Sequence, residues 1–90
     1  MFSWDEDKAA ENLRRHGIDF RDAIGIWERP TMRRASSYPD ELRYLESGIL
    51  DGVVITVVWT PRDGGRRIIS ARRARDYETE DYHDHAGRSR

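Results

Sequence analysis

The chain has 90 residues, of which 37% are charged and 37% hydrophobic, and its formal net charge is −1. A chain of this length supports one small domain, and the absence of cysteine excludes disulfides, thiol catalysis and cysteine-based zinc sites. No apolar run approaches the roughly 20 residues that a membrane-spanning helix needs, so we expect a cytoplasmic protein that does not bind membranes.

A first helix is predicted over residues 5–16. Ser3 or Asp5 can cap its N-terminus, because a short polar side chain accepts hydrogen bonds from the first free N–H groups of a helix. Gly17 follows the helical segment and suits the left-handed conformation in which many helices end. The segment therefore carries both a start and a stop signal.

A second helix is predicted to begin after Asp19 as its N-cap and to end before Pro30. Its apolar side chains recur at i, i+3, i+4 and i+7, which is the spacing of one helix face. The stripe consists of Phe20, Ala23, Ile24 and Trp27. We therefore expect two short N-terminal helices joined by a tight corner.

Four antiparallel strands are predicted in the middle of the chain. Asp51 and Gly52 form a dipeptide that strongly favours a two-residue hairpin turn, and the run after them is apolar enough for a central strand. A longer turn over residues 61–65 is expected before the last strand. The four strands are expected at residues 32–38, 44–50, 53–60 and 67–73.

An acidic helix is predicted after residue 74, and residues 87–90 are expected to form a disordered tail. Helices followed by strands are typical of an α+β domain with helices on one face of an antiparallel sheet. The sequence therefore predicts a single domain over residues 1–86. In this domain two N-terminal helices pack on a four-stranded antiparallel sheet, and a C-terminal helix follows.

Charge is distributed unevenly along the last third of the chain. Residues 61–75 contain six Arg and one Asp, whereas residues 76–85 contain five acidic residues and no Arg or Lys. The guanidinium group binds phosphate through two parallel hydrogen bonds, so the Arg-rich segment suits nucleic acid. Alternatively, the acidic segment neutralises these arginines inside the fold.

Two separated groups of residues carry a resemblance to a known family. The first group is Phe2-Ser3-Trp4-Asp5, Lys8-Ala9, Asn12, His16-Gly17-Ile18, Phe20 and Ala23; the second is Arg43 to Gly48, Trp59-Thr60 and Arg67-Ile68-Ile69-Ser70-Ala71-Arg72-Arg73-Ala74. Together they resemble the BrnT family of ribonuclease toxins from type II toxin–antitoxin pairs. The resemblance implies a RelE-like fold and a metal-independent endoribonuclease that arrests translation without a cofactor. It also implies a BrnA-type antitoxin partner that carries the DNA-binding part, so that operator DNA is contacted only indirectly.

Metal-free RNA cleavage needs a base for the 2′-OH, cations that stabilise the phosphorane, and a proton donor for the leaving 5′-oxygen. The candidate catalytic residues are Arg66, Arg67, Arg72, His16 and Lys8, and the candidate substrate-binding residues are Arg62, Arg73, Ser70 and Tyr82. His16 suits proton transfer by its type, although its place at a helix end also suits a structural role. Lys8 can bind substrate or compensate the charge of the acidic residues around it. Tyr82 can stack on a base or pack in the core.

The strand pattern and the resemblance favour different arginines. If residues 60 and 66 pair, Arg66, Ser70 and Arg72 share the face away from the helices, while Arg67 and Arg73 point toward the helices. The resemblance instead pairs Arg67 with Arg72, which a regular strand points to opposite faces. A β-bulge, or termination of the strand near Arg72, would bring these two arginines together. Both lines of evidence therefore favour Arg72.

Two rival interpretations stay open. In the first, the chain is a non-catalytic interaction module that binds an antitoxin or a transcriptional regulator through its Arg-rich segment and acts as a co-repressor. In the second, the acids after Ala74, where the family usually carries more Arg, weaken the toxin so that it only binds its antitoxin. No metal site is expected at His83-Asp84-His85, because alternate residues of a helix point apart.

Overall fold

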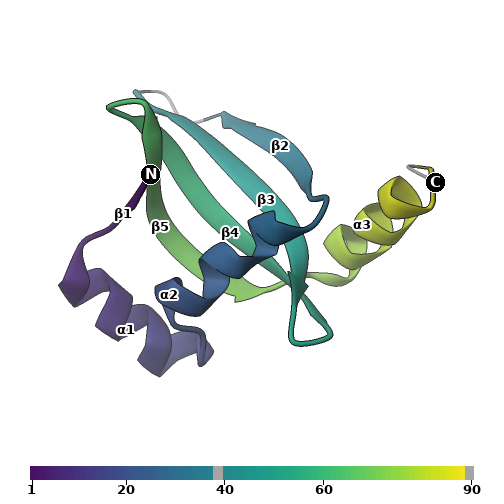
Figure 1. The fold of residues 1–90 in the computed structure, drawn as a ribbon, viewed down its shortest axis with the longest axis horizontal. Coiled ribbons are helices and arrows are strands. Elements are labelled where there is room, and N and C mark those ends of the chain that lie inside the picture. The colour runs from purple at the N-terminus through teal and green to yellow at the C-terminus, as the bar shows by residue number, and fades with distance from the viewer. Residues whose placement is uncertain (38–39, 89–90) are drawn as a thin grey trace.

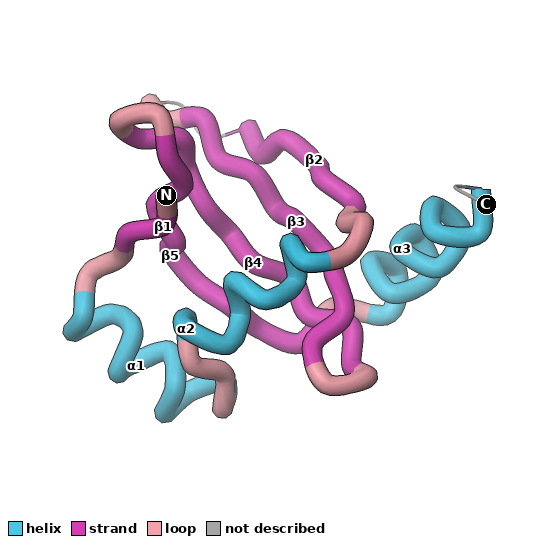
Figure 2. The backbone as a smooth tube through the Cα atoms, viewed as in Figure 1, coloured by secondary structure: helices cyan, strands magenta, loops and turns pink. Residues whose placement is uncertain are grey.

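The computed structural model describes residues 1–37 and 40–88. Within these residues a five-stranded sheet has the order β1-β5-β4-β3-β2, and its β1–β5 pair is parallel (Figure 1). The strands are β1 (Phe2–Ser3), β2 (Met32–Ser37), β3 (Leu42–Leu50), β4 (Val53–Arg62) and β5 (Gly65–Arg73). The helices are α1 (Glu6–His16), α2 (Phe20–Ala23), the 3-10 helix η1 (Ile24–Glu28) and α3 (Asp76–Arg88) (Figure 2).

The structure confirms the α+β class but not the predicted sheet, which has one more strand and is mixed. β1 is only two residues long and pairs with β5 through Phe2–Arg66 and Ser3–Arg67. The Arg66 N–H also donates to the Met1 carbonyl oxygen at 2.8 Å. Two residues show no periodicity, so nothing in the sequence predicted this strand.

α1 begins and ends as predicted. The Asp5 carboxylate accepts hydrogen bonds from the N–H groups two and three residues later, so Asp5 rather than Ser3 is the cap. Gly17 has a φ of 70° and donates to the Leu13 carbonyl oxygen at 2.8 Å. Local capping therefore fixes both ends of the helix.

The second predicted helix is shorter than expected, because α2 gives way to η1 after four residues. Asp19 caps α2 as predicted. A 3-10 helix has three residues per turn, so its side chains do not follow the α-helical stripe that we predicted. In η1, Ile26 is fully buried, whereas Ile24 and Trp27 are partly buried. Gly48 of β3 makes room for Ile26, because a Cβ on this glycine would lie 2.7 Å from the Ile26 Cβ.

Both tight hairpins turn on an Asp-Gly pair. Asp51 and Gly52 have φ values of 50° and 79°, which confirms the predicted two-residue turn. Asp63 and Gly64 have φ values of 52° and 77° and form the same kind of turn between β4 and β5. The longer turn that we expected before β5 is therefore wrong.

A bulge in β5 then decides which arginines share a face. Trp59 pairs with Ile68 but Val58 pairs with Ser70, so β5 has one extra residue, Ile69, at this point. The face away from α1 and α2 carries Arg67, Ser70 and Arg72, and the face toward them carries Arg66, Ile68, Ala71 and Arg73.

The expected register is thus wrong for two arginines. Thr60 pairs with Arg67, and Pro61 rather than Thr60 pairs with Arg66, so these two arginines exchange faces relative to the prediction. Of the two arrangements that the family resemblance allowed, the bulge is present, and it places Arg67 and Arg72 on one face of the sheet. Strand pattern alone could not find it, because an inserted residue leaves no signature in an apolar run.

The elements form three layers. α1, α2 and η1 cover one face of the sheet, and α3 packs on the other face over β2, β3 and β4 (Figure 1). The fully buried core between the first helices and the sheet contains Phe20, Ala23, Ile26, Val57 and Ala71. Within the described part of the chain, no helix is both long and apolar enough to span a membrane.

The C-terminal helix extends further than expected. α3 includes residues 87 and 88, which we had assigned to the disordered tail. Residues 89 and 90 lie outside the described residues, as does residue 38 at the end of the first predicted strand.

Candidate functional site

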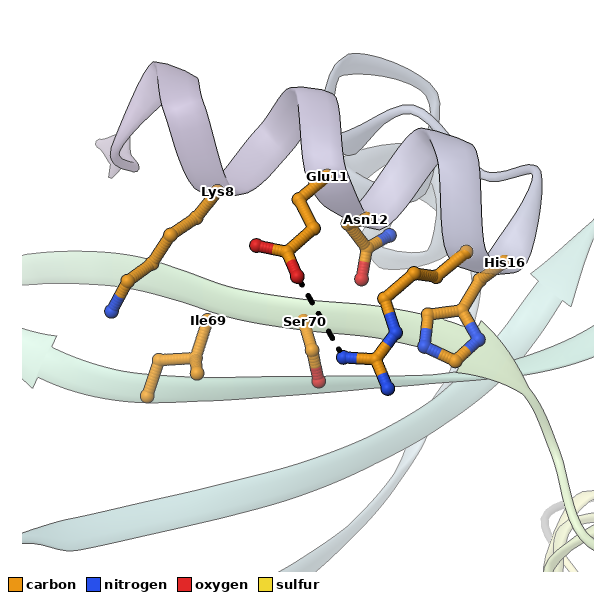
Figure 3. A pocket seen from close by; sticks show the side chains of 7 residues that line it. Lys8, Glu11, Asn12, His16, Ile69 and Ser70 are labelled. Atoms are coloured by element: carbon orange, nitrogen blue, oxygen red, sulfur yellow. Dashed lines mark ion pairs between the residues drawn. The ribbon is translucent and has the colours of Figure 1, made fainter.

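A cleft of about 230 Å³ lies between α1 and β5. Figure 3 shows Lys8, Glu11 and His16 reaching from α1 toward the strand that carries Ser70. The cleft is lined by Lys8, Glu11, Asn12, Arg15, His16, Ile69 and Ser70. It therefore joins three of the predicted site residues, Lys8, His16 and Ser70, from two distant parts of the sequence.

Asn12 fixes α1 against the edge of β5. Its side-chain Nδ2 donates to the carbonyl oxygens of Ala71 and Ile18 at 2.9 and 3.0 Å, and its Oδ1 accepts from the Ala71 N–H at 3.1 Å. Lys8 and His16 stand one turn before and one turn after Asn12, so all three share one helix face. The buried amide thereby positions the exposed side chains of Lys8 and His16 beside the strand.

Lys8 and His16 are exposed, and within the described residues neither side chain has a hydrogen-bond or ion-pair partner. Glu11 and Arg15, which we did not predict, form a loose ion pair of 3.9 Å between Oε1 and Nη1 along the α1 wall of the same cleft (Figure 3). Their i, i+4 spacing beside Asn12 is the signal that could have identified them. The cleft thus holds a carboxylate, a hydroxyl, an imidazole, a lysine amino group and a guanidinium group.

Arg67 adds a further free cation on the strand that forms the cleft. It is half-buried on the same face of β5 as Ser70, and its guanidinium has no partner among the described residues. A half-buried guanidinium without a partner is available for an anion such as a phosphate.

Arg72, the arginine that the sequence favoured most, is instead held by α3. Its two Nη atoms lie 2.7 and 3.1 Å from the carboxylate oxygens of Glu78, which also accepts from the Arg75 N–H at 2.7 Å. Glu78 is fully buried, and its burial raises the pKa of the carboxyl. The hydrogen bonds from Arg72 and the Arg75 backbone outweigh burial and hold this pKa below its usual range. The suggestion that the acidic segment neutralises arginines is therefore correct for Arg72.

The remaining predicted residues lie outside the cleft. Arg66 faces α2 and η1 and stacks on aromatic rings, and Arg62 lies 3.7 Å from Glu41 at the β4–β5 turn. Tyr82 is buried and donates to the Pro30 carbonyl oxygen at 3.4 Å. Arg73 is exposed and lines a neighbouring pocket together with His16.

A metal site was not predicted, and the described residues contain no group of three or more His, Cys, Asp or Glu side chains placed to hold an ion.

The comparisons with known proteins agree with the resemblance noted in the sequence. A search of curated proteins gives no match. The family model described as "Ribonuclease toxin, BrnT, of type II toxin-antitoxin system" matches residues 4–78, which include α1, the whole of β5 and the start of α3. The chain therefore belongs to the BrnT family of ribonuclease toxins of type II toxin–antitoxin systems.

Proposed function

We propose that this protein is a metal-independent endoribonuclease that cuts RNA in the cleft between α1 and β5. Family membership makes RNA the substrate and an antitoxin the partner. The proposal rests on one observation: Lys8, His16 and Ser70 line a single cleft. Three strands, β2, β3 and β4, separate Ser70 from the other two residues along the sequence. The cytoplasm, where messenger RNA is translated, is the proposed site of action.

In the proposed reaction the 2′-oxygen attacks phosphorus, the bond from phosphorus to the 5′-oxygen breaks, and the products end in a 2′,3′-cyclic phosphate and a 5′-OH. Glu11 accepts the proton of the 2′-OH, and the protonated imidazole of His16 supplies a proton to the leaving 5′-oxygen. Lys8 and Arg67 stabilise the charge on the phosphorane oxygens, and the Ser70 hydroxyl orients the phosphate.

RNA cleavage by the purified chain in excess EDTA tests this proposal. We expect cleavage to persist, to fall about 10²-fold or more in His16→Ala, and to fall by a similar factor in Arg67→Ala. Arg62→Ala is the matched control, because Arg62 is an exposed arginine of the same sheet outside the cleft. Cleavage abolished by EDTA and restored by Mg²⁺, or undiminished in both His16→Ala and Arg67→Ala, would contradict the proposal.

We further propose that the partner is a BrnA-type antitoxin and that operator DNA is bound only through it. Support comes from the family match and from the chain's own charge, since a net charge of −1 does not favour direct binding to DNA. Co-purification with a co-expressed antitoxin, followed by operator binding with and without it, tests this point. A folded chain that binds the antitoxin but cuts no RNA would favour the interaction-module interpretation instead.

A further inference from the structure

A second pocket, of about 390 Å³, opens beside the β4–β5 turn on the face that carries α1 and α2. Its walls include two guanidinium groups and two aromatic rings, together with the ring of a proline. They are formed by Arg33, Tyr44, Trp59, Pro61, Gly65 and Arg66. None of these residues lines the cleft between α1 and β5.

Arg66 is held by aromatic rings rather than by acids. Its guanidinium carbon lies 5.0 Å from the ring centre of Trp27 and 4.9 Å from that of Trp59. Its Nε is buried and has no hydrogen-bond partner, the one such side-chain atom among the described residues. Ring faces attract the positive charge but leave the planar N–H groups unsatisfied, so Arg66 keeps donors for a ligand.

The nearby carboxylate of Glu46 cannot satisfy these donors, because other groups use it. Glu46 is buried and accepts from the indole N–H groups of Trp27 and Trp59 at 2.7 and 3.0 Å. It also accepts from the Arg33 Nε at 2.9 Å and from the Thr31 hydroxyl. The pocket therefore has two guanidinium groups and one carboxylate, and only Arg33 bonds to that carboxylate. The charge of Arg66 is left uncompensated.

Arg33 and Tyr44 give the pocket a flat wall. The Arg33 guanidinium lies 5.3 Å from the ring centre of Tyr44 and 5.1 Å from that of Trp59. The two ring centres are 4.8 Å apart, and the rings are tilted by 35° to each other. Nucleobases unstacked from a single strand bind to such aromatic and guanidinium planes. A phosphate beside them can take a two-point hydrogen bond from arginine.

We infer that this pocket binds one nucleotide of single-stranded RNA, with its phosphate on Arg66 and its base against Arg33 and Tyr44. An acidic peptide would use the charge but not the planar wall, so the combination favours a nucleotide. The pocket supplies a second contact for the RNA substrate, away from the proposed cleavage cleft. It rests on the RNA substrate of the family and not on the proposed cleavage chemistry.

Binding of adenosine 5′-monophosphate to the full chain tests this inference without any cleavage. In two-dimensional NMR spectra, we expect the indole N–H signals of Trp27 and Trp59 to shift saturably. The signal of Trp4, which bonds Glu6 at the start of α1 and does not line the pocket, should stay in place. Arg66→Gln should weaken this binding at least about tenfold, since it removes the charge and most of the donors. Arg62→Gln, the matched control at the same turn, should bind as the wild type does.

Tyr44→Leu provides a second variant that leaves both arginines in place. It should weaken adenosine 5′-monophosphate binding but not inorganic phosphate binding, because only the base needs the ring. The inference is overturned if the two indole signals do not move up to about 10 mM nucleotide. It is also overturned if Arg66→Gln, folded by its spectrum, binds as the wild type does, or if a glutamate hexapeptide shifts these signals and the nucleotide does not. His16 does not line this pocket, so His16→Ala should bind adenosine 5′-monophosphate as the wild type does. Loss of RNA cleavage in that variant therefore tests the cleavage proposal alone.

Discussion

Arg67 and Arg72 lie on the same face of the same strand, yet their guanidinium groups differ in their bonding partners. Arg67 has no partner among the described residues, whereas Arg72 forms a bidentate pair with a fully buried carboxylate. The hydrogen bond from Arg72 to Glu78 raises the pKa of the guanidinium still further. A guanidinium whose two Nη groups already bond a carboxylate is poorly placed to bind phosphate. Arg72 therefore anchors α3, and we propose Arg67 as the arginine that contacts the substrate.

Arg72→Ala should therefore lower the free energy of unfolding, and any loss of RNA cleavage should follow from this loss of stability. It leaves the carboxylate of Glu78 buried without its cation, and breaking a buried pair in this way costs about 3–5 kcal/mol. Arg67→Ala breaks no interaction between described side chains and should change the free energy of unfolding by less than about 0.5 kcal/mol. Urea denaturation followed by circular dichroism measures both values.

A double-mutant cycle with Glu78→Gln is the control for this assignment. Adding Arg72→Ala to Glu78→Gln should cost much less than adding it to the wild type, because the buried charge has already gone. If Arg72→Ala is as stable as the wild type but cuts no RNA, Arg72 is catalytic and the anchoring role is wrong.

At the level of elements, the sequence was most informative where a local signal sets the backbone. The cap and glycine of α1 and the Asp51-Gly52 turn act over four or fewer residues, and all of them appear as predicted. The β1 strand and the β5 bulge depend on pairing with distant backbone, and the change from α2 to η1 depends on the packing of Ile26 against Gly48. β1 and the change to η1 have no local signature and were missed, whereas the β5 bulge was expected only from the family resemblance.

The candidate site follows the same division. Lys8, His16 and Ser70 were chosen by residue type and family resemblance, and the fold brings them together in one cleft. Arg66 was chosen from a strand register that one tight turn altered. Glu46 was missed altogether, although a lone acid within an apolar hairpin is a signal for a buried charge that other side chains must satisfy.

Gly48→Ala tests the close contact between β3 and η1. The added Cβ would lie 2.7 Å from the Ile26 Cβ and 3.2 Å from a Thr31 methyl group, so the 3-10 helix must move away. We expect a loss of about 1–3 kcal/mol in the free energy of unfolding, measured by urea denaturation. Gly25→Ala is the matched control, since its nearest neighbour would be the Glu28 carboxylate at 3.4 Å. Equal stability of the two variants would contradict the packing that we describe.

Over the whole molecule, one buried carboxylate lies on each face of the sheet. Glu46 holds the aromatic cluster under η1, and Glu78 holds α3 on the opposite face. Burial raises the pKa of Glu46, but hydrogen bonds from Thr31, Arg33 and the two indoles outweigh it and bring this pKa below its usual 4.5. Both carboxylates must therefore stay ionised for the three layers to hold together.

Stability should consequently fall in acid. Because the pKa of each carboxyl is lower in the folded chain, the unfolded chain binds protons first as the pH drops. The stabilisation is complete above about pH 4.5 and is lost as the pH falls through the folded pKa values. Thermal unfolding between pH 7 and pH 3 should show a level region followed by a steep decline.

Glu46→Gln and Glu78→Gln should each lower the melting temperature at pH 7 and make the acid decline shallower. Glu80→Gln is the control, because Glu80 is exposed on α3 and should leave the curve unchanged. A wild-type pH profile in both buried variants would show that these carboxylates do not govern acid unfolding.

The Asn12 amide has a consequence for how the protein behaves at high concentration. A strand at the margin of a sheet offers unpaired N–H and C=O groups to other chains and so invites aggregation. Along β5, the two residues of β1 occupy the first part of that margin, and the Asn12 side chain satisfies both backbone groups of Ala71 further along. The Asn12 side chain thus makes the two hydrogen bonds to Ala71 that a neighbouring strand would otherwise make. Strand addition by another chain, whether antitoxin or a second copy, is thereby directed toward the β2 margin.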